Sequence, residues 1–247
     1  MNLGRMSWKF SGELKLKKEI PDRRRCETYF MEKKPIDWSL DELLMMAPSG
    51  GKNVEYAIGF YYENGVHTQV DPAQAVTWYE KAAKKGHPEA QLRLGLMAAQ
   101  GRGMEKDPRA AFGWLKKAAD QGNANAQFNV GRCYEEGIGV KKDISRAVSW
   151  FAKAAKKEDF RAVCCLGMYY LSGEGVEKNE KKAFGCFERA ARAGIPAAQY
   201  NLAVLYRYGT GTEMDEEKAL HWMTKAAQQG FALAVKDLNG EETTEDE

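Results

Sequence analysis

The stretch from Cys133 to Ala155, "CYEEGIGVKKDISRAVSWFAKAA", decides the fold because its arrangement of residues recurs along the chain. It combines a turn with two glycines, a single Asp, a Trp and a pair of alanines. A shift of 36 residues places the sequence on itself from residue 59 to residue 227, without any insertion. Seven columns stay in phase over five units, which chance does not produce. The chain is therefore a repeat protein in which each unit packs on its neighbours.

Three of these columns carry most of the structural information. They are Gly59, Gly95, Gly131, Gly167 and Ala203; Asp71, Asp107, Asp143, Asn179 and Asp215; and Trp78, Trp114, Trp150, Cys186 and Trp222. The Asp/Asn column predicts helix N-caps, because these side chains accept hydrogen bonds from free backbone N–H groups. Small and apolar residues then follow at helical spacing up to the Ala pair, which predicts an amphipathic second helix in each unit.

The segment before each glycine turn predicts a first helix. A glycine in the middle of this helix costs about 1 kcal/mol relative to alanine. Because the cost recurs in four units, we expect the backbones of two helices to come close together at this column. The Lys or Arg three residues after each Trp position predicts a solvated flank with buried stems, and not a nucleic-acid stripe.

Composition fits a soluble folded protein, since 44% of the 247 residues are hydrophobic and 29% are charged. The net charge of +2 gives no general reason to expect nucleic-acid binding. No run of 18 apolar residues or export signal is present, so we expect a cytoplasmic chain without a membrane span. We expect the five cysteines to be free thiols.

The two ends lie outside the repeats. Residues 1–51 form an N-terminal extension, in which Ser39 and the leucines after it predict a capping helix near residues 38–47. Residues 7–20 leave strand and loop open as alternatives. Residues 239–247 form an acidic tail that we expect to be solvated and disordered.

The repeated residues match a known pattern. In the third unit they are Ala126, Val130-Gly131, Tyr134, Gly137, Gly139-Val140, Asp143, Ala147, Trp150 and Lys153-Ala154-Ala155. This pattern resembles the Sel1-like repeat family, longer-period relatives of tetratricopeptide repeats. The resemblance covers about residues 52–238, with units at about 52–87, 88–123, 124–159, 160–195 and 196–231 and a short remnant after them. Ala98, Cys186 and Ala203 depart from it, which suggests softer packing in units two, four and five.

The resemblance implies an all-α fold, a right-handed α-α superhelix of five helix-turn-helix repeats with a concave groove. It also implies a non-enzymatic adaptor that binds a partner protein or peptide. No cofactor, nucleic acid, membrane or small-molecule substrate is expected. In the related folds the first helix of each unit lines the groove, and the matching positions supply the candidate site. These candidates are Tyr56, Phe60, Glu63, Leu96, Phe128, Arg132, Glu135, Met168, Tyr200, Val204, Arg207 and Tyr208.

Two alternatives to the adaptor stay open. A secreted effector or toxin-neutralising partner would share the fold and differ in its target. A serine acyl hydrolase could use Ser49 and Lys52, which have the S-x-x-K spacing, although no second catalytic motif accompanies them. A metal site is not expected, because His67, His87 and His221 are far apart in the array.

Overall fold

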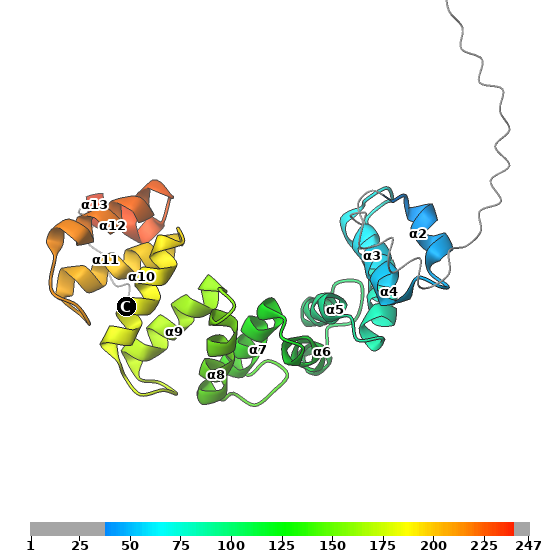
Figure 1. Cartoon of the computed structure of the whole chain (residues 1–247), viewed down its shortest axis with the longest axis horizontal. Helices are drawn as coiled ribbons and strands as arrows, with labels where there is room; N and C mark the ends of the chain where they lie inside the picture. Colours follow the sequence, from blue (N-terminus) through cyan, green and yellow to red (C-terminus); the bar gives the residue numbers. More distant parts are fainter. Residues whose placement is uncertain (1–37, 240–247) are drawn as a thin grey trace, which may run out of the picture.

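The computed structural model describes residues 38–239, which form twelve helices, α2 to α13, and no strand. The helices follow one another along an open arc, with α2 at one end and α13 at the other (Figure 1). Helices next to each other in sequence pack together, as expected for a solenoid of stacked units. None of these helices has the length and apolar character needed to cross a bilayer. The expectations for residues 1–37 and 240–247 lie outside the described residues.

Each unit contributes two helices. The first helices are α3 (Gly51–Asn64), α5 (Pro88–Gln100), α7 (Ala124–Glu136), α9 (Phe160–Ser172) and α11 (Pro196–Tyr208). The second helices are α4 (Pro72–Lys84), α6 (Pro108–Asp120), α8 (Ile144–Ala155), α10 (Glu180–Arg192) and α12 (Glu216–Gln228). Helix α2 (Leu40–Met46) precedes the units and α13 (Ala232–Asn239) follows them. The all-α solenoid of five repeats is confirmed.

The predicted N-caps are confirmed in all five units. The side chain of Asp143, for example, accepts a hydrogen bond from the backbone N–H of Arg146 at 2.9 Å. Asp71, Asp107, Asn179 and Asp215 cap their helices in the same way. Ser39 caps α2 in a reciprocal box with Glu42.

The mid-helix glycines make room mainly for a side chain, whereas the sequence suggested a second backbone; at Gly95 the backbone carbonyl oxygen of Ala111 would also lie 3.1 Å from an added Cβ. A Cβ on Gly131 would lie 2.6 Å from Cε1 of Phe151, a fully buried ring on α8. Gly59 and Gly167 face the rings of Tyr79 and Phe187 in the same manner. In the fifth unit a slimmer methionine, Met223, stands at the ring position, and the mid-helix residue is Ala203. In the second unit the facing residue is an aliphatic side chain, and Cγ of Leu115 would lie 2.8 Å from a Cβ on Gly95.

A column of buried glutamines, which the sequence reasoning missed, connects successive units. The side-chain amide of Gln91 donates to the carbonyl of Ala83, and Gln127 donates to Ala119 in the next unit. Both carbonyls belong to the last turn of a second helix, where each also accepts a backbone N–H from the turn that follows, from Gly86 and Gly122 respectively. In the fourth unit Val163 cannot donate, and the guanidinium of Arg189 reaches the carbonyl of Ala155 instead.

The Trp column lies at the edge of the core. Trp150 is 8% exposed, whereas Trp78, Trp114 and Trp222 are half-buried. A lysine covers the ring in each of these units; the amine of Lys153 lies 3.7 Å from the centre of the Trp150 ring. The lysine column therefore covers the tryptophans through cation–π contacts while its charge stays in water. The described cysteines 133, 164, 165 and 186 are free thiols.

Candidate partner-binding groove

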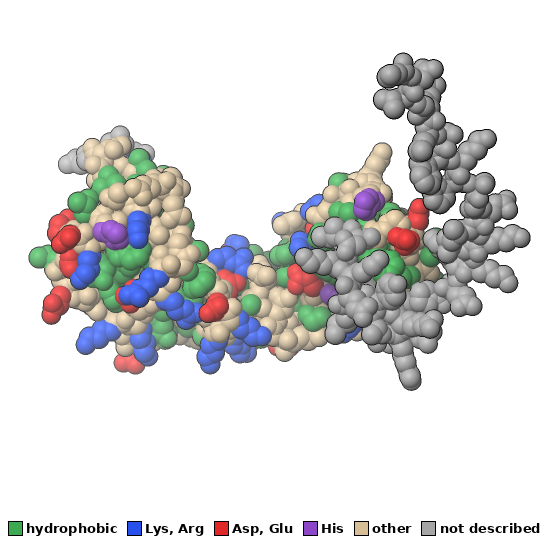
Figure 2. Space-filling model, turned by 45° about the horizontal axis from the view of Figure 1, so that its top comes forward, with side chains coloured by type: hydrophobic (Ala, Val, Ile, Leu, Met, Phe, Trp, Pro, Cys, Tyr) green, Lys and Arg blue, Asp and Glu red, His purple; other side chains and the backbone are tan. Residues whose placement is uncertain are grey.

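The arc has an inner side that is hollowed between its two ends (Figure 2). In its middle, the first helices α5 and α7 lie toward this inner side and the second helices α6 and α8 toward the outer side (Figure 1). The candidate residues belong to the first helices, so the fold presents them in sequence along the arc. We call this inner surface of the first helices the groove.

The candidates differ in how open they are. Arg132, Met168 and Tyr208 are exposed, and Glu63 is buried. The others are half-buried: Tyr56, Phe60, Leu96, Phe128, Glu135, Tyr200, Val204 and Arg207. The most open positions therefore fall in units three to five, with Met168 53% exposed and Tyr208 72% exposed.

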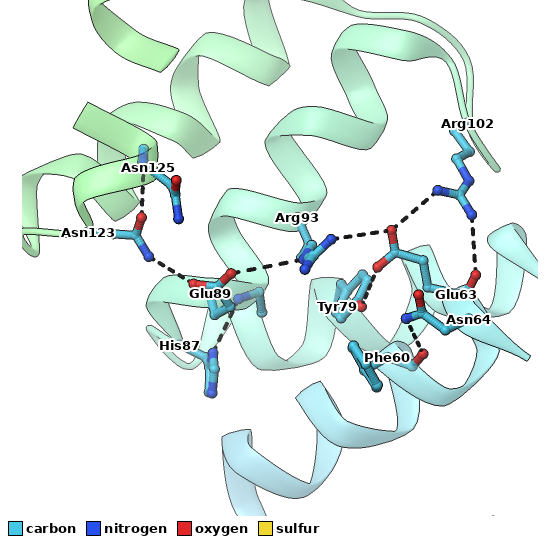
Figure 3. Close-up of polar contacts among 12 residues, drawn as sticks. Phe60, Glu63, Asn64, Tyr79, His87, Glu89, Arg93, Arg102, Asn123 and Asn125 are labelled. Atoms are coloured by element: carbon cyan, nitrogen blue, oxygen red, sulfur yellow. Dashed lines mark hydrogen bonds and ion pairs between the residues drawn. The ribbon is translucent and has the colours of Figure 1, made fainter. Parts of the chain in front are cut away.

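Glu63 is enclosed by residues of the first and second units rather than open to the groove. The hydroxyl of Tyr79 donates to its carboxylate at 2.6 Å, and Nη1 of Arg102 lies 3.4 Å from the other carboxylate oxygen (Figure 3). Nη2 of Arg102 also donates to the backbone carbonyl of Glu63 at 3.2 Å. Burial, together with the bond to Glu63, holds the pKa of Tyr79 far above its ordinary value. Glu63 therefore joins units one and two.

This polar network continues along the first helices. The guanidinium of Arg93 lies 3.8 Å from Glu63 and 3.9 Å from Glu89. Glu89 in turn accepts a hydrogen bond from the amide of Asn123 at 2.9 Å, so the network reaches from α3 to the start of α7 (Figure 3). The charges of this part of the groove are largely occupied by one another, which makes it rigid.

Tyr56 stacks on His87 at the junction of units one and two. The ring centres are 4.4 Å apart and the rings are nearly parallel. His87 is the N-cap of α5, where its Nδ1 accepts the backbone N–H of Ala90 at 3.2 Å. Burial, with a smaller contribution from the charge of Lys52, lowers the pKa of His87 to about 4. The imidazole therefore stays neutral and keeps the lone pair that the cap needs.

We predict a pH dependence at this site. The folded state binds a proton on His87 less tightly than the unfolded chain does. The stability that the neutral imidazole contributes is therefore complete above the unfolded pKa of about 6.5. It is lost as the pH falls toward 4. The variant His87→Asn keeps a cap, since Asn123 caps α7 at the equivalent position. Urea titrations at pH 7 and pH 5 measure the free energy of unfolding. From pH 7 to pH 5, wild type should lose about 1 kcal/mol more of this free energy than the variant, a figure reduced for the partial exposure of His87. Equal losses would show that His87 does not carry this dependence.

The central part of the groove pairs its charges over short distances. Arg132 donates from Nε to Glu136 at 2.9 Å, and the hydroxyl of Tyr169 donates to Glu135 of the preceding unit. Phe128 packs against Phe151 and lies under the guanidinium of Arg161. Met168, on α9, is about half exposed to solvent.

At the far end, two candidates fasten α13 to the array. Arg207 lies 3.7 Å from Asp237 of α13 and 3.8 Å from Glu216 of α12. The hydroxyl of Tyr200 lies 3.4 Å from Asp237, and its ring packs on Phe231. Substituting Tyr200 or Arg207 would therefore disturb the end of the fold as well as the groove. Tyr208 is 72% exposed and makes no such contact within residues 38–239, so its substitution tests the groove without disturbing α13.

One column of the groove was missed by the sequence reasoning. It lies three residues before the Phe60 column and holds Arg93, Asn129, Cys165 and Asn201, all half-buried. Residues three apart lie on one helix face, so this spacing could have identified the column. The amide nitrogen of Asn129 donates to the backbone carbonyl of Asn125 at 2.7 Å, so its amide oxygen and the amide of Asn201 are the hydrogen-bonding groups that this column adds.

Ser49 and Lys52 lie at the end of the array, around the start of α3. The Ser49 hydroxyl lies 3.4 Å from the carbonyl of Met46, and the Lys52 amine donates to the carbonyl of Gly86 at 3.4 Å. The two side chains thus contact different backbone carbonyls.

Comparison with known proteins decides the family. The sequence profile described as "Sel1 repeat" matches residues 54–87, 88–123, 124–159, 163–195 and 196–231, which is more than half of the chain. The chain belongs to the Sel1 repeat family. Sel1-repeat solenoids are generally protein-interaction scaffolds, and the family is generally non-enzymatic.

Two solved Sel1-repeat structures resemble this chain over most of its length. One is a protective antigen present in uropathogenic Escherichia coli strains, which displays an SLR fold. It matches with a TM-score of 0.79 and 33% sequence identity, and the match covers 87% of this chain and 47% of that one. The other is a Sel1 repeat protein from Oxalobacter formigenes, with a TM-score of 0.73 and 33% sequence identity. That match covers 82% of this chain and 59% of the other. This Sel1-repeat chain thus spans about half the length of these relatives.

A curated relative matches over a shorter stretch. Chitin synthase regulatory factor 3 of Schizosaccharomyces pombe is 44% identical over 48 residues, which are 19% of this chain and 5% of that protein. This stretch is little more than one repeat long, so the match is to the repeat itself.

Proposed function

We propose that the chain is a non-enzymatic adaptor that holds a segment of a partner protein in the groove. The observation that carries the proposal is the exposure of Met168 on α9 and Tyr208 on α11. Half-buried Leu171 and Val204 lie on the same two helices. Aromatic residues and methionine are enriched at protein interfaces, and an exposed apolar surface of this kind is typical of a contact site.

The charges of the groove support apolar anchoring rather than recognition of a strongly charged partner. Arg132 pairs with Glu136, and Arg207 pairs with Asp237. A partner that competed for these groups would have to break an existing ion pair. We therefore expect a segment with apolar anchor residues for units four and five, and neutral polar groups facing Asn129 and Asn201.

The test is affinity capture from native lysate, read by mass spectrometry. The groove variant combines Met168→Glu with Tyr208→Ala, both at exposed positions, so its circular dichroism should equal that of wild type. The matched control is Met214→Glu, an exposed methionine in the turn between α11 and α12. We expect wild type and the control to capture the same protein, and the groove variant to lose it at least tenfold. Equal capture by all three proteins would contradict the proposal.

A further inference from the structure

The exposed face of the second helices α8 and α10 is positively charged. Residues three, six, ten and thirteen positions after each N-cap lie on one face of a helix, because this spacing follows the helical repeat. These eight positions are all exposed, and the two that are not basic are Ser149 and Gly185. The other six are Arg146, Lys153, Lys156, Lys182, Arg189 and Arg192. We call these six cations the basic stripe.

The basic stripe lies on the outer side of the arc, away from the groove. The opposite face of the same helices is buried core, with Phe151 on α8 and Phe187 on α10. Figure 2 shows Lys and Arg side chains gathered along the outer, lower edge of the arc. The equivalent positions of α4, α6 and α12 add five Lys and one acid, Asp120, which is paired with Lys116 at 2.6 Å. Positive charge is therefore densest in units three and four.

Most of this charge is not compensated by a neighbouring carboxylate. Arg146 pairs with Asp143 at 3.2 Å, and Arg192 pairs with Glu188 at 2.7 Å. The other four cations of the basic stripe form no ion pair with an Asp or Glu of residues 38–239. An anionic partner could therefore approach these four without breaking an existing ion pair.

Three of these four cations are also held in place. The amine of Lys153 lies 3.7 Å from the centre of the Trp150 ring, and that of Lys182 lies 5.4 Å from the ring of Tyr170. The guanidinium of Arg189 donates to a backbone carbonyl of α8. Because their side chains are positioned before a partner arrives, less conformational entropy is lost on binding.

The cations stand in two rows with small residues between them. The row three positions after the N-caps holds Arg146 and Lys182. The next row stands seven residues further on, about 10 Å along the helix axis. This width is close to the separation of stacked β-sheets, and so to one extended chain with its side chains. Between the rows lie Ser149 and Gly185; a Cβ on Gly185 would meet no atom within 4 Å, so the fold does not require a glycine there.

The chemistry of the stripe favours an acidic protein segment over other polyanions. Single-stranded nucleic acid is bound by exposed aromatic rings on which bases stack, and the stripe has none, since Trp150 beneath it is 8% exposed. The eight positions hold no apolar side chain that could enter a bilayer. The outer side curves outward, so a rigid duplex would meet few of these cations (Figure 1).

We propose that the basic stripe docks an extended acidic segment of a partner protein. The backbone of the segment lies across α8 and α10, over Ser149 and Gly185. Alternate side chains of an extended chain point in opposite directions, so Asp or Glu residues reach both rows of cations. The groove is on the inner side of the arc. This docking site is therefore independent of the proposed adaptor function, and either can fail without the other.

The test is fluorescence anisotropy of a labelled peptide of alternating Glu and Gly, titrated with the full chain at low salt. The stripe variant combines Lys153→Glu with Lys182→Glu. The matched control combines Lys106→Glu with Lys141→Glu, two exposed lysines in turns outside the stripe. Both variants change the net charge equally. We expect the stripe variant to weaken binding about tenfold more than the control does.

A third variant, Gly185→Gln, tests the space between the two rows. Glutamine is the better helix former, and the position is open, so the urea midpoint should rise. The longer side chain occupies the space where the segment lies, so binding of the peptide should weaken about threefold or more. A residue with only a structural role would not change stability and affinity in opposite directions.

Other results would overturn the proposal. Absence of binding by wild type, or equal binding of a Gln–Gly peptide, would exclude an acidic segment as the occupant. Equal losses in the stripe variant and its control would show attraction by net charge alone, and unchanged binding by Gly185→Gln would place the peptide elsewhere. Tighter binding of oligothymidylate, duplex DNA or anionic vesicles would assign the stripe to nucleic acid or to a membrane. Circular dichroism of each variant, expected to equal that of wild type, separates these results from unfolding.

Discussion

Replacing Trp150 by alanine should lower the free energy of unfolding by about 3–5 kcal/mol. The indole is 8% exposed and belongs to the core cluster that runs from α5 to α11. The amines of Lys153 and Lys116 lie 3.7 Å and 5.0 Å from the centre of its ring, so the substitution also removes two cation–π contacts. Trp150 belongs to the third of the five units, in the middle of the array. Because each repeat is stabilised mainly by its neighbours, we also expect the single unfolding transition to split in two.

Urea denaturation followed by circular dichroism measures both effects. The matched control is Trp114→Ala, which removes the same side chain one unit earlier. Trp114 is half-buried, so its removal opens less of the core and should cost clearly less. Equal losses at the two positions, or an unshifted transition for Trp150→Ala, would contradict the burial that the structure assigns to Trp150.

The fold could be predicted from the sequence because its signals are local and repeated. A cap such as Asp143 acts on the helix that it begins, and the helical spacing from Ala147 to Ala155 is contained in one unit. Five copies in one register remove the ambiguity that a single copy would leave. The contacts between units were harder to predict. The link from Gln91 to Ala83 depends on how two helices of successive units meet, and the sequence pattern does not encode that angle.

The state of each groove residue was less predictable than its position. Glu63 is buried because Arg93 and Arg102, 30 and 39 residues further along, reach back to it. Tyr200 and Arg207 were candidates for partner contact, but Asp237 of α13 engages both. A repeat pattern places a side chain on a face. It does not show which neighbour of the next unit already occupies that side chain.

The mid-helix glycines allow a sharper test of the packing. The variant Gly131→Ala should lower the free energy of unfolding by about 1–3 kcal/mol, although alanine is the better helix former. The new Cβ would lie 2.6 Å from Cε1 of Phe151, whose ring is fully buried between Phe128 and Tyr169 and cannot move aside. The control is Gly113→Ala in α6, where a Cβ would meet no atom within 4 Å. That substitution should instead raise the stability by up to about 1 kcal/mol.

A second substitution should reverse the loss at Gly131. The fifth unit combines Ala203 with Met223, so Phe151→Met should give the Cβ at residue 131 the room that it lacks. In a double-mutant cycle measured by urea denaturation, we expect the loss caused by Gly131→Ala to disappear in the Phe151→Met background, with a coupling of about 2 kcal/mol. Additive effects would show that the ring does not impose the glycine. A coupling of the expected size would establish that the ring of Phe151 imposes the glycine at residue 131.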